Sequence, residues 1–168
     1  RTREMKRILF MFTAMAIAMT GCSQTSKQKA PEQKATTVQK AATDGAETED
    51  GKVNYLTTAD FKKKVMDYEK NQQEWVFEGK RPVVIDFYAT WCGPCKMMAS
   101  VVEECAKEYS GKVDFYKIDV DKEKELAQKF GIQSIPTFLF IPVSGKPIIQ
   151  MGAMQKEDFE NLIKQVEK

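Results

Sequence analysis

The sequence predicts an α/β domain in which a mainly parallel sheet is covered by helices on both faces. One observation favours this fold class, and a second modifies it. Runs of β-branched and aromatic residues alternate along the chain with segments whose apolar residues recur at helical spacing. Strands that alternate with helices pair in parallel, because the helix supplies the crossover between them. The last two strands are separated only by a turn at residues 142–147, which adds an antiparallel edge.

Five strands are expected, in the element order β-α-β-α-β-α-β-β-α. The second starts at residue 83 after a proline, reads Val-Val-Ile-Asp-Phe-Tyr and is expected to be buried. The segment 71–80, in which Trp75 and Phe77 alternate with polar residues, fits either a short edge strand or a packed loop. The remaining strands are expected at residues 53–56, 113–120, 137–141 and 148–151.

Four helices follow from apolar residues at helical spacing. Thr58 is the expected N-cap of the first helix and Asp121 that of the third. Gly111 and Gly131 are the expected stops of the second and third. The side chains expected on the inner faces of the helices are Phe61, Val65, Tyr68, Met98, Val101, Val102, Cys105, Tyr109, Leu126, Phe130, Phe159, Leu162, Ile163 and Val166.

Residues 1–21 are expected to form a lipoprotein-type signal peptide. The start is basic, and the apolar stretch at residues 8–20 is too short for the ~20 residues that span a bilayer. Met19-Thr20-Gly21-Cys22 resembles the bacterial lipobox, whose cysteine is acylated and becomes the first mature residue. Cys22 is therefore the predicted lipidation site. An ordinary signal peptide beside an incidental cysteine is the alternative.

Residues 22–51 are predicted to be a disordered tether, and residues 52–168 a single folded domain. Val38 is the only large aliphatic residue of the tether, so this segment cannot bury enough surface to offset the entropy of ordering. A flexible chain of this length spans about 30 Å r.m.s., enough to hold a domain clear of a membrane. Removing residues 1–21 takes away four basic residues and one acidic residue. The formal net charge then moves from +2 to −1, and no nucleic-acid partner is expected.

The strand that starts at residue 83 leads into Cys92-Gly93-Pro94-Cys95. Pro94 fits the first turn of a helix, where its missing N–H costs nothing. Free N–H groups and the helix dipole at this end stabilise a thiolate on Cys92. Cys95, one turn later, can close a disulfide with Cys92. The sequence thus predicts a redox-active cysteine pair that works without a metal or an organic cofactor.

The chain contains no histidine. This excludes His-assisted proteases and hydrolases that hold zinc through histidine. It also excludes the C-x-H-C arrangement of strong disulfide oxidants and isomerases.

The segment Trp91-Cys92-Gly93-Pro94-Cys95-Lys96 resembles the thioredoxin family, and the resemblance extends over about residues 52–168. It implies a thioredoxin fold and thiol–disulfide exchange. Asp86 matches the family's buried carboxylate in the strand before the cysteines, and Lys117 matches the lysine of the following strand that lies near it.

The resemblance also implies a role for each of these residues. Cys92 is the expected attacking thiolate, exposed at the helix start, and Cys95 resolves the mixed disulfide. Burial should raise the pKa of Asp86, which could then take the proton from Cys95. The alternative for Asp86 is a structural carboxylate paired with Lys117, and Lys117 itself is either a tuning charge or a surface residue.

Further matches imply a substrate-binding surface. Ile135-Pro136-Thr137 matches the family's cis-proline segment, and Gly152 matches the glycine that lets a substrate backbone approach. A cis bond before Pro136 would place the Ile135 backbone where an extended substrate can pair with it. The Trp91 side chain is expected partly to form a surface for the substrate and partly to pack against the domain. Gly93 and Pro94 complete the predicted surface.

The chain departs from the family at Ser100, where a helix-kinking proline is usual, and at residues 62–82, which exceed a minimal thioredoxin. Relatives devoted to cytochrome c maturation carry an extra segment between the cysteine-bearing helix and the next strand. Residues 109–113 leave no room for one. This favours a broad-range thioredoxin.

The combined expectation is a monomeric protein-disulfide oxidoreductase of the bacterial cell envelope, lipid-anchored and facing the periplasm. Its partners would be disulfide-bearing envelope proteins, and a transmembrane thiol carrier would recharge it as a reductant. One alternative is a dithiol oxidant driven by a membrane oxidase. Others are a redox-silent module, or a metal-binding module whose two cysteines would fill half of a tetrahedral site. Cys105 is expected to be a small buried hydrophobe.

Overall fold

The computed structural model describes residues 48–168. The predicted signal peptide, the lipidation site Cys22 and the tether up to residue 47 lie outside the described residues, and these predictions stay predictions. Within residues 48–168, no helix is both long enough and apolar enough to span a bilayer.

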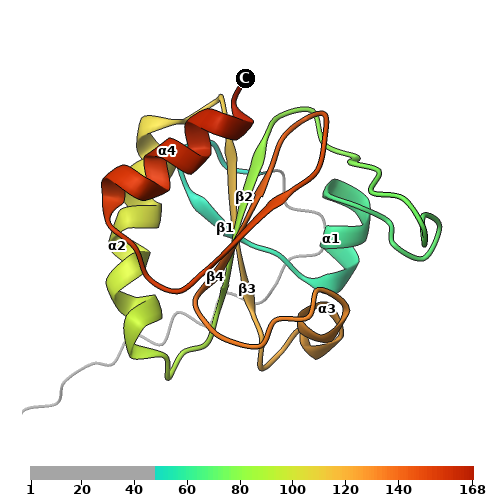
Figure 1. The fold of residues 1–168 in the computed structure, drawn as a ribbon, viewed down its shortest axis with the longest axis horizontal. Coiled ribbons are helices and arrows are strands. Elements are labelled where there is room, and N and C mark those ends of the chain that lie inside the picture. Colours follow the sequence, from blue (N-terminus) through green and yellow to red (C-terminus); the bar gives the residue numbers. More distant parts are fainter. Residues whose placement is uncertain (1–47) are drawn as a thin grey trace, which may run out of the picture. The chain divides into compact units, whose positions relative to one another are not determined.

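Five strands form one mixed sheet in the order β1-β3-β2-β4-β5 (Figure 1). β2 pairs in parallel with β3, which pairs in parallel with β1, whereas β4 runs antiparallel to β2 and β5. The predicted element order and the antiparallel edge are therefore confirmed. The strands are β1 Val53–Tyr55, β2 Val83–Tyr88, β3 Asp114–Asp119, β4 Thr137–Ile141 and β5 Ile148–Met151.

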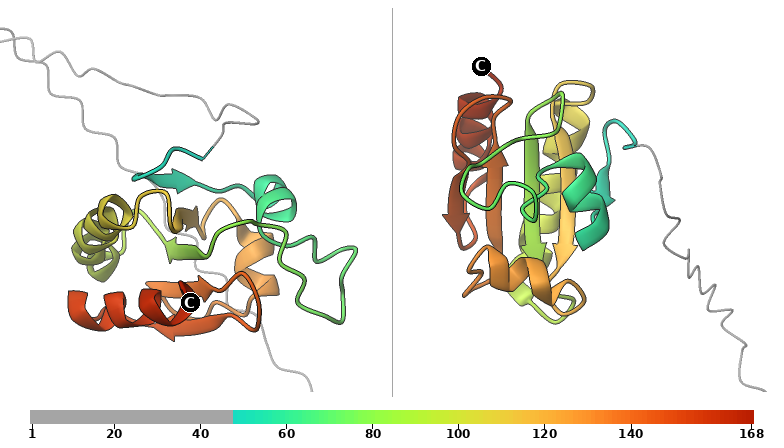
Figure 2. Two further views of the ribbon diagram at one scale, coloured as in Figure 1. Left: turned by 90° about the horizontal axis from the view of Figure 1, so that it is seen from above. Right: turned by 90° about the vertical axis from the view of Figure 1, so that its right-hand side faces the viewer.

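Helices cover both faces of the sheet, with α2 and α4 on one side and α1 and α3 on the other (Figures 1 and 2). Alternate residues of a strand point to opposite faces. In β2, Val84 packs in the core under α2 and α4, whereas Ile85 and Phe87 pack in the core under α1 and α3. The helices are α1 Thr58–Lys64, α2 Gly93–Glu108, α3 Lys124–Lys129 and α4 Lys156–Val166.

The predicted N-cap of α1 is wrong by one residue. Thr57, not Thr58, is the cap: its Oγ1 accepts the N–H of Asp60 at 3.1 Å. The Thr58 hydroxyl instead donates to Glu123 at 2.5 Å. α1 ends at Lys64, so Tyr68 lies beyond the helix although it is buried as predicted.

The predicted N-cap of α3 is also wrong, because Glu123 rather than Asp121 precedes the helix. The N–H groups of residues 122 and 123 donate to the Asp119 carbonyl, which forms a turn before the helix begins. The Asp121 N–H donates to the Asp119 carboxylate at 3.1 Å within the same turn.

The segment 71–80 is a packed loop, so the edge-strand alternative is wrong. Trp75 and Phe77 are partly buried against the core under α1 and α3. The Trp75 ring meets Phe130 edge-on, with ring centres 6.3 Å apart. Packing of single aromatic side chains holds this segment to the domain, together with one backbone hydrogen bond from the Glu78 N–H to the Val65 carbonyl at 2.9 Å.

The described chain enters the fold at the amino ends of β2 and β3. The Thr48 and Tyr116 hydroxyls hydrogen-bond at 2.7 Å. Arg81, just before β2, bridges Asp50 at 2.7 Å and Asp114 at 2.5 Å. These contacts tie residues 48–50 to the end of the sheet opposite the carboxyl end of β2.

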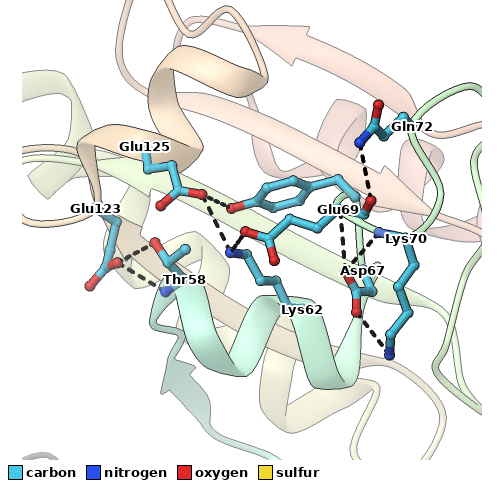
Figure 3. Close-up of polar contacts among 9 residues, drawn as sticks. Thr58, Lys62, Asp67, Glu69, Lys70, Gln72, Glu123 and Glu125 are labelled. Atoms are coloured by element: carbon cyan, nitrogen blue, oxygen red, sulfur yellow. Dashed lines mark hydrogen bonds and ion pairs between the residues drawn. The ribbon is translucent and has the colours of Figure 1, made fainter.

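A polar network joins α1, α3 and the chain that follows α1. Figure 3 shows Glu123 meeting Thr58 and Glu125 meeting Lys62, which also pairs with Glu69 at 2.5 Å. The buried Tyr68 donates its hydroxyl to Glu125 at 2.5 Å. These polar contacts link the two short helices beside the apolar core that lies under them.

We expect Tyr68→Phe to lower the free energy of unfolding by about 1 kcal/mol, because it deletes one hydrogen bond to a carboxylate and keeps the ring. Denaturant unfolding measures this loss. Lys70→Ala is the control, since it removes only the exposed pair with Asp67 and should cause no measurable loss. Equal effects of the two substitutions would contradict the role given to Tyr68.

Candidate active site

The cysteine pair lies where β2 passes into α2. Cys92 is the N-cap of α2, and its Sγ accepts the N–H of Cys95 at 3.1 Å. Pro94 stands in the first turn, as predicted from its missing N–H. The Cys92 N–H donates to the Ala89 carbonyl at 3.1 Å, which closes the turn after the strand. The Cys92 sulfur therefore sits at the positive end of a sixteen-residue helix.

Cys92 and Cys95 form a disulfide, with Cα atoms 5.3 Å apart. Cys92 is only 4% exposed and Cys95 3%, so the expected exposure of Cys92 is wrong for this oxidised form. The pair packs with Ala89, and Tyr88, Val120 and Ile135 lie against the same cluster. These surrounding side chains explain why little of the disulfide is exposed.

The surface around the disulfide is formed by exposed residues. Trp91 is 68% exposed, and its indole N–H donates to Asp121 at 2.8 Å. Most of the Trp91 side chain is therefore open to solvent, and its role toward a substrate stays a prediction. Gly93 and Pro94 are exposed beside it, and a Cβ on Gly93 would meet no atom within 4 Å.

The Ile135–Pro136 peptide bond is cis, which confirms the prediction for this segment. Gly152 donates its N–H to the Pro136 carbonyl at 2.8 Å and has φ of +86°. A Cβ at Gly152 would meet no atom within 4 Å, so the backbone conformation, not crowding, requires glycine. Ile135 lies against the cysteine cluster, which brings the cis-proline segment to the disulfide.

Asp86 is buried in β2 with 5% of its surface exposed, and its Oδ1 has no hydrogen-bond partner within residues 48–168. It shares the face of Val84 by strand alternation, which is the face covered by α2. Burial raises the pKa of Asp86 to about 7, against a smaller lowering effect of Lys117. A carboxyl in this range can take or release a proton near neutral pH.

Lys117 lies beside Asp86 on β3, and the two Cα atoms are in register. Within the described chain Asp86 Oδ1 has no hydrogen-bond partner, so the predicted alternative of a carboxylate paired with Lys117 is not realised. The Lys117 ammonium lies instead 4.4 Å from the Tyr55 ring centre and 6.0 Å from that of Tyr88. Sequence reasoning missed both tyrosines.

Cys105 is fully buried and is not in a disulfide, in agreement with its predicted role as a small hydrophobe. Burial raises the pKa of its thiol to about 11. Within residues 48–168, the one group with metal-ligand spacing is Cys105 with Glu108 and Glu160. Lys156 already pairs with Glu108 at 2.7 Å and with Glu160 at 3.8 Å, and Lys164 pairs with Glu160 at 3.5 Å, so both carboxylates already have cationic partners.

A disulfide at the start of a helix, beside a cis-proline and a buried carboxyl, defines a thiol–disulfide oxidoreductase of the thioredoxin fold. A family model described as Thioredoxin matches residues 52–165. The chain therefore belongs to the thioredoxin family. It is a protein-disulfide oxidoreductase with Cys92 and Cys95 as its redox pair, so the redox-silent alternative is wrong.

Individual relatives agree with this assignment. A thioredoxin of Borreliella burgdorferi is 54% identical over 109 residues, which cover 65% of this chain and 92% of that protein. A chloroplastic M-type thioredoxin of Spinacia oleracea is 43% identical over 91 residues, which cover 54% of this chain and 50% of that protein. The solved structure of the thioredoxin Mala s 13 of Malassezia sympodialis has a TM-score of 0.54 and 32% identity, and the match covers 73% of this chain and 97% of that one.

We expect Asp86→Asn to stabilise the oxidised protein at pH 8 but not at pH 4. The pKa of Asp86 is about 7 in the fold and 3.8 in the reference state. The folded state therefore retains a proton that the unfolded chain releases, and stability falls as pH rises from about 4 to 7. The gain at pH 8 should reach up to ~4 kcal/mol.

Denaturant unfolding of both proteins at the two pH values measures this difference. A gain that is the same at pH 4 and pH 8 would show that the ionisation of Asp86 costs the fold nothing.

Proposed function

We propose that this thioredoxin is a disulfide reductant of the bacterial cell envelope. The observation that carries the direction is the pair Gly93-Pro94 between the cysteines, in a chain without histidine. No cation lies between the cysteines to favour the Cys92 thiolate beyond what the helix end provides. A potential near ~−270 mV rather than near ~−120 mV follows, and the gap equals about 7 kcal/mol for two electrons.

The proposed reaction has two exchange steps. The Cys92 thiolate attacks a substrate disulfide, forms a mixed disulfide and expels one substrate thiolate. Cys95 then gives its proton to Asp86, attacks the Cys92 sulfur and releases the second substrate thiolate. The substrate gains two electrons, and the Cys92–Cys95 disulfide of the present structure is the product. Lys117 tunes the charge of Asp86 in this scheme.

An extended substrate segment is proposed to bind beside the disulfide. The Ile135 backbone next to the cis-proline would pair with it, and the exposed Trp91 ring would cover it. The open space at Gly152 and at Gly93 leaves room for a substrate backbone. Pro94 borders the same surface.

The location rests on residues 1–22, whose basic start, short apolar stretch and Cys22 favour a lipid anchor facing the periplasm. Residues 48–50 contact the end of the sheet away from the cysteine pair, so attachment through the preceding residues does not require the cysteines to be covered. Outside the cytoplasm the electrons would come from a transmembrane thiol carrier through dithiol exchange. The protein would act as a monomer.

We expect Cys92 and Cys95 to be mostly reduced in growing cells. Acid quenching followed by alkylation of free thiols measures whether the two cysteines are reduced. Cys105 serves as an internal standard, because it has no disulfide partner and should be alkylated in every molecule after unfolding. A mostly oxidised pair that becomes reduced when a membrane oxidase is deleted would instead assign the protein as an envelope oxidant.

We expect a fatty-acid analogue to label the wild type and not Cys22→Ala. Cys105→Ala is the matched control, since this cysteine is buried in the fold and should not affect labelling. Equal labelling of wild type and Cys22→Ala, or a wild type recovered wholly in the soluble fraction, would contradict the anchor.

A further inference from the structure

Three side chains lie level with one another across three neighbouring strands. Tyr55 on β1 is in register with Lys117 on β3, which is in register with Asp86 on β2. Strand alternation sends all three toward the face covered by α2, where the cysteine pair begins the helix. Lys117 therefore stands between an aromatic ring and a buried carboxyl.

The position of the ammonium is the unexpected feature. A lysine on a flexible four-carbon stem beside an unpaired carboxyl would ordinarily form an ion pair. Here the Lys117 Nζ lies 4.4 Å from the Tyr55 ring centre, and Asp86 Oδ1 has no partner within residues 48–168. The centre of the Tyr88 ring lies 6.0 Å from the same ammonium.

The cost of removing the Lys117 ammonium from water explains why it lies over Tyr55 and not beside Asp86. Pairing with Asp86 would draw the ammonium into a buried site and cost its hydration. Over Tyr55, which is 68% exposed, the ammonium keeps contact with water and gains a cation–π attraction. An aromatic face at this position can therefore favour a placement of the Lys117 ammonium away from Asp86.

We propose that Tyr55 is a positioning residue that holds the Lys117 ammonium away from the Asp86 carboxyl, and so leaves Asp86 free to exchange a proton with Cys95. The inference rests on the proposed role of Asp86 as proton acceptor. It adds a residue from the edge strand, remote in sequence from the cysteines, to the machinery of the resolving step.

Few other groups face Asp86. Its own strand contributes Tyr88, whose pKa is raised mainly by burial and further by Tyr55, Asp119 and Asp86. α2, which covers this face, begins at the two cysteines, and β4 presents the uncharged Phe138 in register with Asp86. The buried residues of α4 are apolar. Lys117 is thus the cation whose placement can change the titration of Asp86.

The test follows the Asp86 carboxyl by carbon NMR across pH in the wild type, Tyr55→Ala and Tyr55→Phe. Removal of the ring should let Lys117 approach Asp86 and lower its pKa by about half a unit, the equivalent of a cation–π contact at an exposed site. Tyr55→Phe retains an aromatic face and should titrate like the wild type. Tyr55→Leu is a second ring-free variant in case Tyr55→Ala weakens β1.

A double-mutant cycle isolates the contact from general effects on the strand. In a Lys117→Met background, Tyr55→Ala should leave the titration of Asp86 unmoved. A shift of the same size in this background, or no shift with Lys117 present, would overturn the proposal.

The rate of mixed-disulfide resolution against pH separates this proposal from the proposed function. If the NMR titration and the rate profile both move to lower pH in Tyr55→Ala, the positioning role of Tyr55 and the role of Asp86 as proton acceptor are both supported. If the titration moves and the rate profile does not, Tyr55 positions Lys117 as inferred, and Asp86 is not the proton acceptor.

Discussion

The burial of β2 is the constraint on which the site depends. Val83 to Phe87 are buried on both faces of the sheet, and β2 pairs with β3 on one side and β4 on the other. The cysteine pair follows its carboxyl end, Asp86 lies within it, and the cis-proline immediately precedes β4. A rigid central strand thus sets the mutual positions of groups that come from different parts of the chain.

The same burial makes ionised Asp86 destabilising. The fold tolerates this loss of free energy because the surrounding apolar core is large. A carboxyl that gives up water in an apolar layer destabilises the fold when it ionises. Six phenylalanines are fully buried, and each contributes roughly 1.5–3 kcal/mol through removal of apolar surface from water. Two or three such side chains offset the ionised carboxyl. This balance is the expected signature of a residue kept for chemistry rather than for stability.

The helices and strands could be predicted from the sequence because the residue patterns that determine them are local. The predictions were wrong where a contact between distant parts of the chain determines the structure. Helical spacing predicted the burial of Phe61, Val65 and Tyr68, yet α1 ends at Lys64. Thr58 looked like a cap, but its hydroxyl binds Glu123, which lies 65 residues further along the chain. The choice between Thr57 and Thr58 thus depends on a tertiary contact. The loop at residues 71–80 likewise takes its shape from packing against Phe130.

Some residues of the candidate site could likewise be identified from local sequence, whereas others could not. Cys92, Pro94 and Cys95 could be identified because strand end, turn and helix start lie within a few residues of one another. Tyr55 could not, because its partner Lys117 lies 62 residues away and the contact requires the parallel register of β1 on β3. Such a register is set by the whole packed sheet, and a shift by one residue would send Tyr55 to the other face. Cys92, Pro94 and Cys95 are therefore found in a short motif, and Asp86 and Lys117 through the resemblance to a family, whereas Tyr55 is found only when neighbouring strands are aligned.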